Sequence, residues 1–359
     1  MRIGLVIYGS LATMSGGYLY DRMLVEKLRR QGDSVEIISI ARRSYGLNIV
    51  DNLRDLQRPG LDLILQDELN HPSLFLANGR AHRTPILSIV HHLRSSERRW
   101  APENAVYRHV ERLYLKTVDG FVYNSDTTRR SVERLTGKGM PCVVATPGGD
   151  RLGTTSPARV RARAAERGPL RLIFVGNLIP AKGLDVLLSA LGELPREDFH
   201  LDVIGSEELA PEYTARIRRT AHVLQLPVTF HGPLAEGALS ERLQDAHVLA
   251  LPSYYEGFGI AFLEGMAHGL AALGSRAGAV EALITNGENG YLIESGDAPA
   301  LARHLAELAR DRRLLAKLGV GALRRYARFP TWDQTTDRIR DFLLTVATRR
   351  ASDARTEPG

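Results

Sequence analysis

Short apolar runs alternate with longer amphipathic segments along the whole chain. In the first half, runs of the strand type cover residues 3–8, 35–40, 61–65, 86–90, 121–124 and 143–146. Between several of these runs, apolar residues recur at helical spacing over residues 18–30, 103–118 and 125–135. Continuous apolar strands separated by helices are typical of a parallel sheet that is covered on both faces.

The alternation is interrupted once and then resumes. Residues 154–170 are rich in Arg, Ala, Gly and Pro and lack a strand pattern, so we interpret them as a linker. Beyond them, strand-like runs cover residues 172–175, 201–204, 228–230, 248–251 and 291–293, and helical patterns cover residues 184–191, 213–224, 261–268, 299–308 and 312–327. The sequence therefore predicts two doubly wound α/β domains, at residues 1–165 and 166–331.

A last amphipathic stretch, residues 332–348, follows Pro330 and has no strand behind it. A lone helix of this kind has to bury its apolar face on one of the two domains. Doubly wound sheets bind ligands at the carboxyl ends of their strands, so two facing domains are expected to hold a ligand between them.

Composition and charge narrow the class of protein. The chain has 359 residues, of which 44% are hydrophobic, and its one cysteine, Cys142, excludes a disulfide framework and favours a reducing cytoplasm. Residues 1–165 hold 25 Lys and Arg against 16 Asp and Glu, whereas the remaining residues hold 22 against 25. This asymmetry indicates either solvated helix faces or an anionic or membrane-borne partner, the latter placing the protein at the inner face of the membrane. Nucleic acid is disfavoured, because the Arg pairs lack interleaved aromatic residues.

The most informative motif is the segment 252–264, Pro-Ser-Tyr-Tyr-Glu-Gly-Phe-Gly-Ile-Ala-Phe-Leu-Glu. It follows the apolar run 248–251, passes through a glycine-rich turn and opens a helix, whose first N–H groups form a site for phosphate. Glu264 lies among small apolar residues, and a buried carboxylate there needs donors, which the two hydroxyls of a ribose would supply. The alternative is a structural turn with one solvated and one capping glutamate.

This segment resembles the signature of the retaining GT-B glycosyltransferases of family 4, in which two glutamates are separated by seven residues. Further resemblances to that family extend over most of the chain. They are Gly16-Gly17 before the first helix, Val90-His91-His92-Leu93, Val175-Gly176-Asn177-Leu178 with Ala181-Lys182-Gly183, Val203-Ile204-Gly205, Phe230-His231-Gly232 and residues 286–292.

The resemblance implies a GT-B fold with two facing Rossmann-like domains and a final helix that crosses back to the first domain. It implies that an enzyme of this hexosyltransferase type transfers a sugar from a nucleotide-diphosphate sugar to an acceptor hydroxyl, with retention and without a metal or other cofactor. The first domain would hold the acceptor, and the second would hold the donor. The expected catalytic residues are Glu256 and His91, with His92 as the alternative if the register slips by one. The expected donor-binding residues are Gly16, Gly17, Asn177, Lys182, Gly257, Phe258, Gly259, Ile260 and Glu264.

Two features bear on the expected absence of a metal. The sequence has no Asp-x-Asp triplet to bridge a cation to the diphosphate, so fixed positive charge and backbone dipoles have to stabilise the leaving group. Lys182 would supply one charge. Asn177 stands where the family usually has arginine, so a second charge is missing unless Arg94 supplies it.

Other classes of protein fit less well. A Rossmann dehydrogenase is disfavoured, because Gly9-Ser10-Leu11-Ala12 replaces the expected G-x-G-x-x-G after the first strand. A nucleotide-sugar epimerase or a glycan phosphorylase does not explain the paired glutamates. A binding module without catalytic activity stays open because of Asn177.

Overall fold

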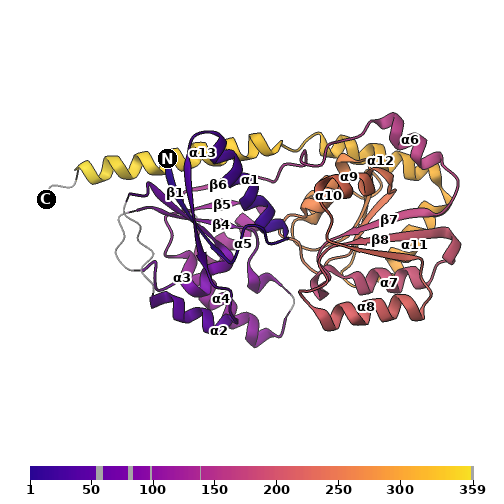
Figure 1. Ribbon diagram of the computed structural model, residues 1–359, viewed down its shortest axis with the longest axis horizontal. Coiled ribbons are helices and arrows are strands. Elements are labelled where there is room, and N and C mark those ends of the chain that lie inside the picture. Colours follow the sequence, from indigo (N-terminus) through magenta and orange to yellow (C-terminus); the bar gives the residue numbers. More distant parts are fainter. Residues whose placement is uncertain (54–59, 80–83, 98, 138, 357–359) are drawn as a thin grey trace. The chain divides into compact units, whose positions relative to one another are not determined.

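The structure is a computed structural model that describes residues 1–53, 60–79, 84–97, 99–137 and 139–356, the last eight by their backbone alone. The chain forms two compact units (Figure 1). Unit 1 comprises Met1–Pro147 and Trp332–Gly359, and unit 2 comprises Gly148–Thr331.

Unit 1 is built on a six-stranded parallel sheet with the order β2-β1-β3-β4-β5-β6. The interior strands β3, β4 and β5 are buried throughout, as expected for strands with helices on both faces. The sequence predicts every one of these strands to within a few residues. The strands are β1 Arg2–Tyr8, β2 Ser34–Ile40, β3 Leu63–Asp67, β4 Ile86–Val90, β5 Gly120–Tyr123 and β6 Cys142–Val144.

Helices cover both faces of this sheet, with α1 and α13 on one side and α3 and α4 on the other (Figure 1). The first helix begins at Ser15, whose hydroxyl accepts from the Tyr18 N–H, and the fifth begins at Ser125, which caps the Thr128 N–H. The helices of unit 1 are α1 Gly16–Arg30, α2 Tyr45–Asn48, α3 His71–Leu74, α4 Ala101–Leu115, α5 Asp126–Thr136 and α13 Trp332–Thr356.

The last helix belongs to unit 1, as predicted for residues 332–348. Trp332 is buried with its ring edge against Tyr20, and Ile339 and Leu343 are fully buried. Arg340 Nε donates to Asp33 Oδ2 at 2.6 Å. The helix therefore completes the core of the first unit although unit 2 lies between them in the sequence.

Unit 2 holds a second six-stranded parallel sheet, with the order β12-β11-β10-β7-β8-β9. Helices again cover both faces, with α9, α10 and α12 on one side and α7, α8 and α11 on the other (Figure 1). The strands are β7 Leu170–Val175, β8 Phe199–Ile204, β9 Val228–Gly232, β10 Val248–Leu251, β11 Ala271–Ser275 and β12 Gly290–Ile293. The helices are α6 Pro157–Ala165, α7 Leu184–Gly192, α8 Pro211–Val223, α9 Glu236–Asp245, α10 Ile260–Ala267, α11 Ala298–Arg310 and α12 Arg312–Tyr326.

The prediction that residues 154–170 form a linker without regular structure is wrong. Residues 157–165 form helix α6, which Ser156 caps by accepting from the Arg159 N–H. Helix α6 packs against α12, and buried Arg163 donates to three backbone carbonyls of unit 2. These contacts place the division between the units after Pro147 and not after residue 165. Redrawn in this way, unit 1 holds 26 Lys and Arg against 20 Asp and Glu, and unit 2 holds 21 of each.

Besides helix α6, the sequence prediction also lacks strand β11 and helix α9. Strand β11 consists of small residues, Ala-Ala-Leu-Gly-Ser, and helix α9 has a weakly apolar face. In the part of the chain that the structure describes, no helix combines the length and the apolar character needed to cross a bilayer.

Candidate functional site

In unit 2, the chain adds strands β8 and β9 on one side of β7 and then strands β10, β11 and β12 on its other side. The direction of the connections therefore reverses between β7 and β10. Doubly wound sheets bind ligands at such a switch point. Glycines hold the loops together there: a side chain at Gly183 would clash with the carbonyl of Pro252, and one at Gly205 would clash with the carbonyl of Gly176. The loops after β7, β8 and β10 therefore form one closely packed edge.

Lys182 and Glu256 meet at this edge. The Lys182 ammonium donates to Glu256 Oε1 at 2.6 Å, and the Ser253 hydroxyl donates to the same oxygen at 2.7 Å. Glu256 is buried, whereas a quarter of the Lys182 side chain is exposed. The ammonium from the loop after β7 is thus paired with an acid from the loop after β10 and remains partly exposed to solvent.

Asn177 has a structural partner in the loop after β8. Its Oδ1 accepts from the Ser206 N–H at 3.2 Å, and the Leu178 N–H donates to the Ser206 carbonyl at 2.9 Å. The amide in the place of the usual arginine therefore binds backbone within unit 2. Arg94 lies in unit 1, with its guanidinium over the rings of Tyr45 and Tyr107.

The glycine-rich turn leads into α10 as the sequence predicts. Gly259 caps the helix with a positive φ of 95°, and Ile260 is its first residue. Phe258 is buried against Phe329. A side chain at Gly278 would clash with the carbonyl of Glu256, so this turn is also held from the loop after β11.

Glu264 is buried on α10 and has a protein partner that the sequence did not reveal. Arg151 donates to its Oε1 through Nε at 3.0 Å and through a terminal nitrogen at 2.6 Å, and also pairs with Glu236 at 2.8 Å. Burial raises the pKa of Glu264, and the Arg151 charge opposes that shift. Both bonds from Arg151 reach Oε1, and no bond from a described residue reaches Oε2.

In unit 1, His91 directly follows β4, as expected. Gly16 and Gly17, expected as a loop, are instead the first two residues of α1. A side chain at Gly17 would lie 2.9 Å from Cδ2 of His91, so this glycine allows the helix to approach the imidazole ring. The His91 Nε2 lies 3.1 Å from Oδ1 of Asp21. The sequence analysis did not identify Asp21 as a site residue.

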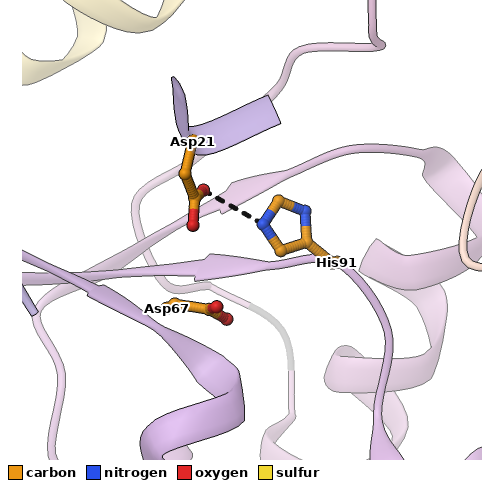
Figure 2. A group of neighbouring side chains, drawn as sticks. All are labelled: Asp21, Asp67 and His91. Atoms are coloured by element: carbon orange, nitrogen blue, oxygen red, sulfur yellow. Dashed lines mark hydrogen bonds and ion pairs between the residues drawn. The ribbon is translucent and has the colours of Figure 1, made fainter. Parts of the chain in front are cut away.

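Asp67, at the end of β3, lies beside this pair (Figure 2). Burial and the neighbouring Asp21 charge raise the pKa of Asp67 to about 7. The ligand atoms of Asp21, Asp67 and His91 lie within 4.8 Å of one another, close enough to share one ion or one proton. Because Nε2 of His91 is already hydrogen-bonded to Asp21, we interpret this group as a hydrogen-bonded cluster.

A second buried group of three lies nearby in unit 1, formed by Glu68, His71 and Glu111. Both ring nitrogens of His71 have partners, since Nε2 bonds to the Tyr45 hydroxyl at 2.8 Å and Nδ1 bonds to the Glu68 carbonyl at 3.0 Å. Burial lowers the pKa of His71 to about 4 and raises that of Glu68 to about 8. We interpret this group, like the first, as a hydrogen-bonded cluster.

The profile of the family described as "Glycosyl transferases group 1" matches residues 158–325, which include Asn177, Lys182, Glu256 and Glu264. The matched segment lies within unit 2 and makes up a little under half of the chain. A relative from Xylanimonas cellulosilytica, named D-inositol 3-phosphate glycosyltransferase, is 29% identical over 244 residues, which cover 65% of this chain and 58% of the relative. The chain thus spans well under two thirds of that relative's length.

The fold matches those of solved glycosyltransferases. Sucrose-phosphate synthase from Thermosynechococcus elongatus superposes with a TM-score of 0.81 at 20% identity, covering 97% of this chain and 99% of that one. HepE from Anabaena, solved in complex with UDP and glucose, has a TM-score of 0.77 at 18% identity, covering 96% and 100%. The two parallel sheets with their flanking helices are therefore those of the GT-B fold that the motifs implied.

Proposed function

We propose that the protein is a retaining glycosyltransferase that moves a sugar from a nucleotide-diphosphate sugar to an acceptor hydroxyl without a metal ion. The observation that carries this proposal is the Lys182–Glu256 contact at the switch point of the family's own domain. A cation that reaches solvent beside a helix N-terminus suits a diphosphate, and a buried carboxylate beside it suits sugar hydroxyls.

Each expected donor contact has a candidate atom in unit 2. The Lys182 ammonium and the first N–H groups of α10 would bind the diphosphate. Oε2 of Glu264 would accept from a ribose hydroxyl, since Arg151 occupies only Oε1. Glu256 would bind hydroxyls of the transferred sugar while it anchors Lys182.

In the proposed reaction, the bond between the anomeric carbon and the diphosphate oxygen breaks, and the acceptor oxygen bonds to that carbon on the same face. Lys182 and backbone N–H groups would stabilise the negative charge that develops on the departing diphosphate. We propose a UDP-sugar as the first donor to test, because HepE shares the fold and was solved with UDP.

The acceptor is proposed to be anionic and held by unit 1. The excess of Lys and Arg in that unit supports this, and so does the name of the relatives, which refers to a phosphorylated polyol. A membrane-borne phosphate group and a soluble one share this chemistry, and binding to vesicles with an anionic lipid distinguishes them.

The test is a donor panel with matched variants. Thermal unfolding is measured with UDP-, GDP- and ADP-sugars, since a donor at 100 times its Kd stabilises the fold by about 2.7 kcal/mol. We expect Lys182→Met to weaken nucleotide-diphosphate binding by roughly 10- to 100-fold, the loss of one charged hydrogen bond. Glu256→Gln should retain nucleotide binding and lose transfer.

Lys317→Met serves as the control, because Lys317 is exposed on α12. Proton NMR of the product gives the anomeric configuration, and EDTA treatment should leave the rate unchanged. Donor affinity that is equal in wild type and Lys182→Met, or an inverted product, would contradict the proposal.

A further inference from the structure

Four neighbouring residues fix His91 in place. Its ring lies against the backbone of Gly17, and the edge of the Tyr20 ring meets it at a centroid distance of 5.2 Å. Its own carbonyl accepts from Asn124 Nδ2 at 2.8 Å. The Asp21 carboxylate then fixes which ring nitrogen points inward, because it accepts from Nε2 at 3.1 Å.

The surroundings of this ring are acidic. Asp21 is fully buried, and Asp67 and Glu68 are nearly so. Among the described residues, neither Asp21 nor Asp67 has a Lys or Arg within ion-pair distance. Asp21 Oδ2 is buried and makes no hydrogen bond there, and Figure 2 shows it on the side of Asp21 that faces Asp67. A positive charge on His91 is therefore the nearest compensation for two buried carboxylates.

We propose that Asp21 and Asp67 keep His91 protonated, so that its outward Nδ1–H donates a hydrogen bond to the substrate and does not act as a base. Asp21 is a positioning residue in this arrangement. The inference deepens the proposed function and rests on it, because the partner of Nδ1 is the substrate of the proposed reaction.

The free edge of the ring supports this role. No described residue hydrogen-bonds to Nδ1 of His91, and about an eighth of the side chain is exposed. Figure 2 shows this nitrogen on the edge of the ring away from Asp21. A base would need a lone pair on Nδ1, and the imidazolium has none there. Nδ1 can then only donate, and a proton from the acceptor hydroxyl has to leave to another group.

Charge balance agrees with the geometry. The charged groups that act on His91 are Asp21 from α1, and Asp67 and Glu68 from the end of β3, and the Tyr20 ring packs beside it. Burial alone disfavours the imidazolium, but the charge and hydrogen bond of Asp21 outweigh it, so the pKa of His91 is raised. The ring therefore keeps its proton to higher pH than an ordinary histidine does.

The experiment follows the His91 ring by NMR in protein labelled at histidine, with His91→Gln to assign the signal. In wild type we expect His91 to titrate above pH 6.5, the ordinary range of histidine. In Asp21→Asn the midpoint should fall by at least one unit, and Asp21→Glu should restore part of it. Asp337→Asn, on the exposed side of α13, removes the same charge from unit 1 and should shift nothing.

The pH profile of kcat/KM gives the second readout. Activity should be lost as the pH rises through the His91 midpoint, and that alkaline limb should move to lower pH in Asp21→Asn. A wild-type midpoint below pH 6.5, or activity that rises as His91 loses its proton, would overturn the inference. So would a stoichiometric metal ion whose removal by EDTA shifts the His91 signals. Absence of transfer with every donor would refute the proposed function, whereas the NMR titration decides the protonation state independently.

Discussion

A single acid interrupts the apolar face of one helix in each unit. Glu264 lies on α10 among Phe262, Leu263 and Met266, and Asp21 lies on α1 among residues of the core. Each acid has one positively charged or titratable partner, Arg151 in unit 2 and His91 in unit 1. Removing one partner leaves a buried charge without compensation, which costs more free energy than the pair itself contributes.

Arg151→Met tests this at Glu264. Methionine keeps the volume of the side chain but leaves Glu264 without its donor, so we expect the free energy of unfolding to fall by about 3 kcal/mol at pH 7.5. Chemical denaturation monitored by circular dichroism measures it. The loss should shrink at pH 5, because Glu264 has a raised pKa, and protonation then favours the folded state as the pH falls.

The double variant Arg151→Met with Glu264→Gln is the matched control. Once the acid is neutral, removal of the arginine should cost clearly less than in the wild-type background. Equal losses in both backgrounds would show that Arg151 stabilises the fold through packing and not through Glu264.

Single residues were predictable where their own neighbours carried the signal. Glu264 stood out because small apolar residues surround it in the sequence, and the structure buries it. Asp21 lacks this signal, because the charged Arg22 follows it directly in the sequence. Arg151 could not be inferred, since its partner lies 113 positions away and nothing local distinguishes it from other surface arginines.

At the scale of elements, close contacts through glycine decide how helices pack in unit 2. Helix α12 crosses α6 and the turn after α10 at Gly319, where an added side chain would lie 2.6 Å from the Gly269 carbonyl and 2.7 Å from Val160. Real side chains do not approach so closely, so any larger residue has to push α6 away.

Gly319→Ala therefore destabilises unit 2 although alanine favours helix. We expect a loss of about 1 to 3 kcal/mol in the free energy of unfolding, the usual cost of overpacking. Gly237→Ala is the control, because Gly237 lies in α9 with open space around it and should be neutral or stabilising by up to about 1 kcal/mol. Equal stability of the two variants in urea denaturation would contradict the packing of α6 on α12.

Long apolar strands and amphipathic helices were predicted well because their pattern is local. Strand β11 was missed because alanine and glycine give it no β-type pattern, and tertiary burial alone makes it a strand. The sequence does not predict helix α6, because its arginines interrupt the apolar face that Val160 and Ala164 form. The cap at Ser156 with Pro157 after it was the available signal.

At the scale of the whole molecule, the units differ in charge and in surface. Unit 1 carries the excess of basic residues. Helix α4 exposes the cations Arg108 and Arg112, the acid Glu103 and the apolar residues Val106 and Leu113, and Trp100 before it and Lys116 after it are exposed as well. Arg98, close to the start of this helix, lies outside the described residues. A helix that exposes both kinds of side chain suits the surface of an anionic membrane.

If the acceptor is membrane-borne, the protein should bind vesicles that contain an anionic lipid and not neutral ones. Each cation near an anionic surface contributes about 1 kcal/mol, so replacing Arg108, Arg112 and Lys116 by glutamine should lower vesicle affinity by roughly 100-fold.

The matched control replaces the exposed cations Arg313, Lys317 and Arg324 of α12 in unit 2 and should leave binding unchanged. Co-sedimentation at low and high salt measures both, and binding should weaken as the Debye length shortens from about 10 Å at 0.1 M salt to 3 Å at 1 M. Binding that ignores salt, or is equal in the two triple variants, would refute an electrostatic contact through α4. Absence of vesicle binding would leave a soluble phosphorylated acceptor as the substrate of unit 1.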